Sequence, residues 1–180
     1  MPLYFAYGSN MDVTAMHSRA PASRPLGLAR LARHRFLVMP EGYASVARDP
    51  RGTVWGLLWD LALSDVPALD RYESLHTGLY TKIVQPVLTQ GGTRQALVYV
   101  GHTTRTGVPK PGYMEGVLAA ARAAGLPESA LADLALWLPR QAGPAREAAK
   151  PVAPGVTPIA ASPSERPASG TVSPGWSWRP

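Results

Sequence analysis

The chain begins with a segment whose residues can bind an anion or a carbonyl oxygen. Residues 4–7 are aromatic or small, which suits a buried strand, and they are followed by Gly8, Ser9 and Asn10. These three residue types release the backbone from a strand ladder, and Asp12 is a favourable N-cap for a helix. A strand, a glycine turn and a helix start together form a nest of backbone N–H donors, although a plain strand–helix connection has the same pattern.

Glu73 is the carboxylate that is best placed to carry a proton. It follows a short helix predicted at residues 65–71, and the partial negative charge at a helix C-terminus disfavours an ionised carboxylate. Tyr72 and Leu75 can remove water from the same group, which also raises its pKa. A raised pKa suits general acid–base catalysis. The alternative interpretation is a surface glutamate after a helix.

The other reactive residue types limit the chemistry further. The chain has no cysteine, which excludes a disulfide framework, a thiolate zinc site and a cysteine nucleophile. Its glycines form neither a G-x-G-x-x-G pattern nor a P-loop, so a nucleotide-binding domain is not indicated. We predict neither a metal nor a cofactor, because metal-ligand spacing is missing among the four histidines: His17, His34, His76 and His102. His76 is either a second proton carrier or a solvated loop side chain.

The formal net charge of +6 at pH 7 raises the question of nucleic-acid binding. The excess comes from scattered arginines, and the densest cluster is Arg30, Arg33, His34 and Arg35. Because no basic patch is interleaved with aromatic residues, we interpret the charge as solvated surface and expect no nucleic-acid partner. No apolar stretch approaches the roughly 18 residues that span a bilayer, and no signal-peptide pattern follows Met1. We therefore expect no membrane contact and a cytoplasmic location.

The elements that position these residues are predicted from periodicity and turn residues. Strands are expected at 2–7, 33–39, 43–48, 53–61, 80–89 and 93–100. A turn at 49–52 is expected to join two of these strands, and Gly91 and Gly92 are expected to form a hairpin. Helices are expected at 12–19, at 65–71 with Ser64 as N-cap, from 114 to 125, and around 131–138. Strands come first and helices close the chain, so the fold class is α+β rather than a βαβ array.

The composition changes near residue 142, which divides the chain into a domain at 1–142 and a tail at 143–180. The tail holds eight of the nineteen prolines, many Ala, Ser and Gly residues, and few large aliphatic side chains. Such a segment buries too little apolar surface to offset its ordering entropy, so we expect a disordered tail. Its Trp176 and Trp178 either dock on the domain or on a partner, or stay unstructured.

Four motifs follow one another in an order and spacing that resemble the γ-glutamylcyclotransferase family, which includes AIG2-like proteins. They are YGSN at 7–10, VWG at 54–56, Asp70-x-x-Glu73 and Gly78-x-Tyr80. The resemblance runs from Tyr4 to about residue 126. It implies a small mixed β-barrel-like sheet with flanking helices. It also implies a reaction in which the α-amine of a γ-glutamyl compound attacks its own γ-carbonyl and closes 5-oxoproline, with no metal and no covalent nucleophile.

The same resemblance gives each part of the predicted site a role. Glu73 would be the general base and acid that moves the proton. A small γ-glutamyl substrate would be bound by the opening segment and by two tyrosines: Tyr4, Phe5, Ala6, Tyr7, Gly8, Ser9, Asn10, Tyr80 and Tyr113. Each tyrosine has an alternative interpretation as a half-buried packing residue. Ser74 departs from the family pattern, in which glycine often follows the catalytic glutamate, and this departure can alter the backbone angle at that turn.

Four functions remain open at this point. The leading hypothesis is a γ-glutamylcyclotransferase that acts on small γ-glutamyl amino acids or peptides. A γ-glutamylamine cyclotransferase would release a free amine instead, but that branch more often has YGTL where this chain has YGSN. A third hypothesis is an enzyme that removes a γ-glutamyl protecting group in a biosynthetic pathway. The fourth is a non-catalytic binding module of the same fold. The carboxylate of Glu73 counts against it, because a binder of anions would gain from losing that charge.

Overall fold

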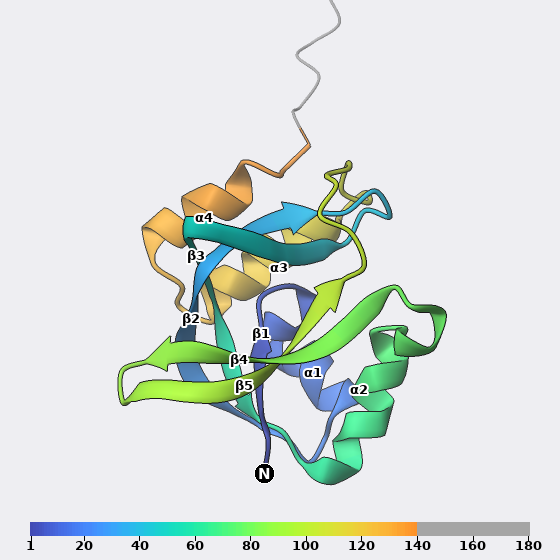
Figure 1. Ribbon diagram of the computed structural model, residues 1–180, viewed down its shortest axis with the longest axis vertical. Coiled ribbons are helices and arrows are strands. Elements are labelled where there is room, and N and C mark those ends of the chain that lie inside the picture. Colours follow the sequence, from blue (N-terminus) through green and yellow to red (C-terminus); the bar gives the residue numbers. More distant parts are fainter. Residues whose placement is uncertain (140–180) are drawn as a thin grey trace, which may run out of the picture. The chain divides into compact units, whose positions relative to one another are not determined.

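A closed five-stranded barrel forms the centre of the computed structural model, which describes residues 1–139 (Figure 1). The strands lie in the order β1 (Leu3–Ala6), β3 (Ala44–Asp60), β2 (Arg24–Val38), β4 (Tyr80–Thr89) and β5 (Gly92–Gly101). Most neighbours are antiparallel, whereas β1 and β5 run parallel and close the barrel where Tyr4 pairs with Leu97. The predicted α+β class with a barrel-like sheet is confirmed.

In residues 1–139, four helices and three short 3₁₀ turns surround this barrel. The helices are α1 (Val13–Arg19), α2 (Val66–Tyr72), α3 (Tyr113–Ala123) and α4 (Glu128–Ala135). The 3₁₀ turns are η1 (Ser9–Met11), η2 (Leu63–Asp65) and η3 (Leu75–Thr77). In Figure 1, α2 and α4 lie on opposite sides of the barrel, and α3 contacts both α4 and η1.

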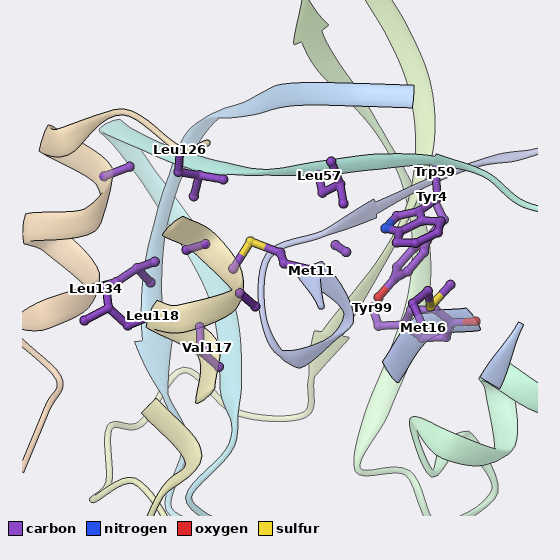
Figure 2. Packing of buried hydrophobic residues seen from close by; sticks show 14 of the residues in the cluster. Tyr4, Met11, Met16, Leu57, Trp59, Tyr99, Val117, Leu118, Leu126 and Leu134 are labelled. Carbon is purple, nitrogen blue, oxygen red and sulfur yellow. The ribbon is translucent and has the colours of Figure 1, made fainter. Parts of the chain in front are cut away.

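Two clusters of buried side chains stabilise the domain. The larger one lies between the barrel and the helices, and Figure 2 shows that side chains from α3 and α4 gather at one end of it while aromatic residues gather at the other. The first group contains Val117, Leu118 and Leu134, together with Leu126 from the connection between α3 and α4, and the second contains Tyr4, Trp59 and Tyr99. The smaller cluster includes Phe5, Leu31 and Val98, which are at most 1% exposed. Successive residues of β1 therefore enter different clusters, because side chains alternate along a strand.

The turn predicted at 49–52 is wrong, because β3 continues through these residues. The pairing shifts there, from His34 opposite Arg48 to Ala32 opposite Thr53, so that β2 has a single residue facing four residues of β3. Turn chemistry is still present, since Asp49 Oδ1 accepts a hydrogen bond from the Arg51 N–H at 3.0 Å. The turn residues are thus accommodated as a bulge within one long strand rather than as its end.

The other predicted elements agree in part with the structure. The hairpin between β4 and β5 is confirmed. Asp12 is confirmed as the N-cap of α1, where its Oδ1 accepts from the Ala15 N–H at 3.0 Å. The predicted cap at Ser64 is wrong: this residue lies inside η2, and no side chain caps α2. Residues 24–32 were not predicted to be extended, yet they form the first half of β2.

The predicted tail at 143–180, with its two tryptophans, lies outside the described residues, as does the predicted boundary at residue 142. Within residues 1–139, no helix is both long and apolar enough to cross a membrane. The same part of the chain contains no group of three or more His, Cys, Asp or Glu side chains arranged to hold a metal ion.

Candidate active site

A cavity of about 180 Å³ opens where β1, α2, β4, β5 and α3 meet. Half of the residues that line it are tyrosines, and Glu73 is the one carboxylate among them. The lining residues are Tyr4, Tyr7, Gly8, Ser9, Asn10, Tyr43, Ala44, Tyr72, Glu73, Ser74, Leu79, Tyr80, Tyr99 and Tyr113. The fold therefore brings the opening segment, the glutamate and both predicted tyrosines to one place.

Two residues of the predicted site do not line this cavity. Phe5 is fully buried in the smaller hydrophobic cluster, and Ala6 is buried in the larger one. Both lie in β1, whose backbone pairs with Leu58 and Leu57 of β3. They position the segment around them by packing, which is a different role from the predicted contact with substrate.

The end of α2 places Glu73 at the cavity. Its N–H donates to the Leu69 carbonyl at 2.9 Å, so Glu73 closes the helix. Ser74 then adopts the left-handed conformation, with φ +53° and ψ +43°, and turns the chain away from the helix axis. Gly78 repeats this conformation after η3, with φ +74°, and leads into β4. Two left-handed residues thus let the chain reverse within a short connection while the glutamate stays at the cavity wall.

Among residues 1–139, one neutral donor, the Asn10 side chain, contacts the Glu73 carboxylate. The Asn10 side-chain amide donates to Glu73 Oε1 at 2.7 Å and to Tyr4 Oη at 2.9 Å. Burial raises the pKa of Glu73 to about 7, while the charge of Arg19 and the hydrogen bond from Asn10 oppose that increase. The predicted upward shift is confirmed, with burial as its largest cause rather than the helix terminus. At neutral pH this carboxyl group is therefore divided between its two protonation states.

The tyrosines around Glu73 stay protonated near neutral pH. Burial raises the pKa of Tyr113 to about 12, and it raises the pKa values of Tyr4, Tyr7 and Tyr80 as well. Tyr80 Oη donates its proton to the Ala44 carbonyl at 2.6 Å, so this proton is not available to a ligand. Tyr113 Oη instead accepts from the Ala44 N–H at 3.1 Å and finds no acceptor for its own proton within residues 1–139. Tyr113 thus has a hydroxyl proton that can be donated into the cavity, and among residues 1–139 the same holds for Tyr4 and Tyr43, whose hydroxyls accept from Asn10 and Lys110.

Gly8 brings the opening segment close to that hydroxyl. A Cβ atom at this position would lie 3.3 Å from Tyr113 Oη and 3.4 Å from the Ala44 Cβ. The first distance is tighter than an ordinary contact and the second is an ordinary one, so glycine allows the backbone of the opening segment to approach the Tyr113 hydroxyl without crowding. The predicted turn of Gly8, Ser9 and Asn10 therefore lies directly beside Tyr113.

Several residues at the cavity could not be identified from the sequence. Tyr72 is the last residue of α2 and was considered only as a group that removes water from Glu73. Tyr43 and Tyr99 belong to none of the motifs. Arg19 lies at the end of α1, and its Nη1 donates to Asn10 Oδ1 at 2.5 Å. Only the proximity of Tyr72 to Glu73 in the chain offered a signal. The remaining contacts depend on the barrel, which joins strands far apart in sequence.

Known proteins are similar in sequence to much of this chain. A model of the AIG2-like family matches residues 53–134. The Gamma-glutamylcyclotransferase of Bos taurus is 31% identical over 136 residues, which cover 69% of this chain and 72% of the relative. The chain belongs to the γ-glutamylcyclotransferase family. The Gamma-glutamylcyclotransferase of Homo sapiens is 29% identical with the same coverage, and the predicted family is thereby confirmed.

A solved structure supports the same assignment. A structure titled "Gamma-glutamyl cyclotransferase" superposes with a TM-score of 0.72 at 27% identity, and it covers 81% of this chain and 94% of its own. The match to the family model contains Glu73, Tyr80 and Tyr113 but begins after the opening segment. Membership in this family supports a cyclotransferase activity for the chain.

Proposed function

We propose that this chain is a γ-glutamylcyclotransferase that cleaves small γ-glutamyl amino acids or peptides and releases 5-oxoproline. The observation that carries the proposal is Glu73, a carboxyl group with a pKa of about 7 that lies in a cavity lined by tyrosines. A base whose pKa is near the working pH is efficient both in taking up a proton and in returning it. The small volume of the cavity, about 180 Å³, fits a γ-glutamyl group better than a large ligand.

In the proposed reaction the substrate attacks itself. The α-amine forms a new C–N bond to the γ-carbonyl carbon, and the original γ-amide C–N bond then breaks. Glu73 accepts the proton that the α-amine loses and returns it to the departing nitrogen, so the carboxylate is regenerated and charge is balanced. Because α-amines titrate at roughly 8, much of the amine is protonated at neutral pH; this ammonium first releases one proton to solvent, and Glu73 takes the second as the C–N bond forms. Holding the two ends of the substrate together contributes about 7–11 kcal/mol in favourable cases.

The oxygen of the γ-carbonyl becomes negatively charged in the tetrahedral intermediate, and donors must stabilise it. Tyr113 has a hydroxyl proton available at the cavity, next to the turn that begins at Gly8. The first N–H groups of a helical turn have no partner within that turn, and η1 starts at Ser9. We assign Tyr113 and the backbone N–H groups of this turn as donors to the γ-carbonyl oxygen. Tyr80, whose hydroxyl proton is bound to Ala44, is assigned to the cavity wall.

A cation beside the cavity favours a leaving group that bears a carboxylate. Lys110 Nζ donates to Tyr43 Oη at 2.6 Å and lies 4.2 Å from the centroid of the same ring. Tyr43 lines the cavity, so Lys110 places a positive charge next to it. An amino acid or peptide released through its α-amine has a carboxylate close to the scissile bond that this charge attracts, whereas a simple amine has none and lysine released through its Nζ has it farther away. This supports amino acids over amines as leaving groups.

Release of 5-oxoproline from a panel of substrates tests the proposal. The purified chain is incubated with γ-glutamyl dipeptides, with γ-glutamyl-ε-lysine and with α-glutamyl dipeptides as matched isomers. We expect 5-oxoproline from the γ-glutamyl dipeptides, less from γ-glutamyl-ε-lysine, and no free 5-oxoproline from the α-glutamyl isomers, because ring closure onto their γ-carboxyl group does not break the α-peptide bond. Product from γ-glutamyl-ε-lysine alone would favour the amine-specific branch. Binding of γ-glutamyl dipeptides without any product would identify a binding module instead.

A further inference from the structure

Arg19 contacts two of the residues that surround Glu73. It is the last residue of α1, and its Nη1 donates to Asn10 Oδ1 at 2.5 Å. Its guanidinium carbon lies 3.9 Å from the centroid of the Tyr72 ring, which is the range of a cation–π interaction. Arg19 is therefore a half-buried cation that is fixed between the opening segment and the end of α2.

The contact with Arg19 decides how the Asn10 amide is oriented. The amide nitrogen has two protons, one donated to Tyr4 Oη and the other to Glu73 Oε1. The amide oxygen faces Arg19, whose guanidinium offers only donors. If the amide turned over, its nitrogen would face the guanidinium and its oxygen would face the carboxylate. Both of those contacts are repulsive when Glu73 is ionised, so Arg19 selects the arrangement in which Asn10 donates to Glu73.

We propose that Arg19 is a positioning residue of this site: it holds the Asn10 amide so that its nitrogen, and not its oxygen, faces the Glu73 carboxylate. The inference rests on the proposed function, because it concerns the state of Glu73 as a base. Asn10 is 3% exposed, so water cannot easily replace a lost contact on its amide oxygen. Removal of Arg19 leaves that oxygen without its partner and frees the amide to turn over.

The other groups that face Glu73 do not replace this charge. Tyrosines that stay neutral near pH 7 are the groups on neighbouring elements: Tyr4 of β1, Tyr7 just after it, Tyr80 of β4, Tyr99 of β5 and Tyr113 of α3. Asp70, one turn earlier on α2, is paired with Lys82 of β4 at 2.7 Å. Within residues 1–139, Arg19 is the one cation that lowers the pKa of Glu73 against the effect of burial.

The pKa of Glu73 can be measured without any substrate, by following its ¹³C-carboxyl signal as a function of pH. In the wild type we expect a midpoint of about 7. In Arg19→Met the midpoint should rise by about one unit, because the charge that lowers the pKa is lost and the Asn10 amide, freed to turn over, no longer donates to the carboxylate. Arg19→Lys keeps the charge and one donor, so its midpoint should lie between the two.

The matched control is Arg30→Met. The guanidinium carbon of Arg30 also lies over an aromatic ring, 5.4 Å from the centroid of Trp55, but neither residue lines the cavity. We expect no change in the Glu73 midpoint for this variant. An unchanged midpoint in Arg19→Met overturns the proposal. So does an equal shift in an Asn10→Ala background, because Arg19 would then act as a remote charge and not through the amide.

Turnover provides a second measurement. If the midpoint moves from about 7 to about 8, the ionised fraction of Glu73 at pH 7 falls about fivefold, and kcat/KM should fall with it and recover at higher pH. A loss of kcat/KM by the same factor at every pH would indicate a structural role and contradict the proposal. If the wild type releases no 5-oxoproline, the proposed function is wrong, and the substrate-free titration still decides the role of Arg19.

Discussion

Two carboxylates lie one helical turn apart at the end of α2, and their surroundings differ completely. Asp70 contacts Lys82 Nζ at 2.7 Å and accepts from Tyr99 Oη at 2.6 Å, so it connects α2 to β4 and β5. Within the described part of the chain, Glu73 contacts no cation directly; it accepts from the neutral Asn10 amide and lies in the cavity wall. Burial raises the pKa of Glu73 to about 7. The same functional group is thus held as a structural anion at one position and as an exchangeable acid at the other.

The comparison shows that the D-x-x-E spacing does not by itself distinguish a catalytic group from a structural one. A carboxylate next to a cation and a hydroxyl donor stays ionised and stabilises the contacts that it makes. A carboxylate that loses water without gaining a cation keeps a proton available near neutral pH. The amide variant of Glu73 should therefore lose turnover but not stability, whereas the amide variant of Asp70 should lose stability but little turnover. The following variants test this.

Glu73→Gln should have the largest effect, a loss of kcat of about 10²–10⁴-fold, because the amide cannot accept the proton of the substrate amine. The variant keeps the side-chain volume and an oxygen that accepts from Asn10. Release of 5-oxoproline under saturating γ-glutamyl dipeptide measures the loss. Turnover within a few-fold of the wild type would remove Glu73 from the mechanism.

The stability of the same variant distinguishes lost chemistry from lost structure. The folded-state pKa of Glu73 lies above its ordinary value of 4.5, so ionisation of this group costs stability as pH rises from about 4.5 through about 7. Glu73→Gln removes that cost, and the variant should be more stable than the wild type at pH 8, by roughly 1–3 kcal/mol. At pH 4 the two should be alike. Urea unfolding at both pH values measures the difference.

Asp70→Asn should show the reverse pattern, with an intermediate effect. It removes the ion pair between Asp70 and Lys82, in which the Lys82 side chain is 25% exposed and the Asp70 side chain is 28% exposed. The free energy of unfolding should fall by about 1–2 kcal/mol, in the range of hydrogen bonds to charged groups, while kcat falls less than tenfold. Urea unfolding and 5-oxoproline release are the two measurements.

The Arg24–Asp60 pair is a suitable control for that prediction. Its atoms are 3.0 Å apart, but the Arg24 side chain is 71% exposed. Arg24→Gln should therefore cost less than about 1 kcal/mol. If Asp70→Asn abolished turnover while Arg24→Gln and Asp70→Asn unfolded at the same urea concentration, the assignment of a structural role to Asp70 would be wrong.

The contrast also explains which parts of the site were predictable. The strand, the glycine turn and the cap at Asp12 depend on local backbone chemistry, and their residues occur consecutively. The direction of the pKa shift at Glu73 followed from its place after a helix and beside large side chains. Its dominant cause, burial by the barrel, required the complete fold.

Long-range pairing accounts for the predictions that failed. The residues at 49–52 have strong turn propensity, but the register between β2 and β3 holds them in a bulge. At Gly52 a Cβ atom would lie 2.3 Å from the His34 carbonyl oxygen, so this glycine is required by the partner strand rather than by a turn. Arg19 was missed for a similar reason, since no periodicity in the sequence relates the end of α1 to Tyr72.

A substitution at Ser74 has the smallest predicted effect. This residue lies in the connection from α2, which carries both carboxylates, to β4. A non-glycine residue in the left-handed conformation costs roughly 1–2 kcal/mol, whereas glycine adopts it freely but loses more entropy on folding. With φ +53° at Ser74, Ser74→Gly should raise the free energy of unfolding by about 0.5–1 kcal/mol and leave kcat within about twofold. Chemical denaturation and 5-oxoproline release measure the two quantities.

Two further variants separate backbone strain from the loss of the Ser74 hydroxyl. Ser74→Ala removes the hydroxyl but keeps φ positive, so it should not be stabilised. Gly78 adopts φ +74° at the other end of the same connection, and a Cβ atom there meets nothing within 4 Å. Gly78→Ser should therefore cost about as much as Ser74→Gly gains, because both changes alter conformational preference without creating a clash. A stabilised Ser74→Ala would show that the hydroxyl at the cavity wall, and not the backbone angle, is what the glycine of the family avoids.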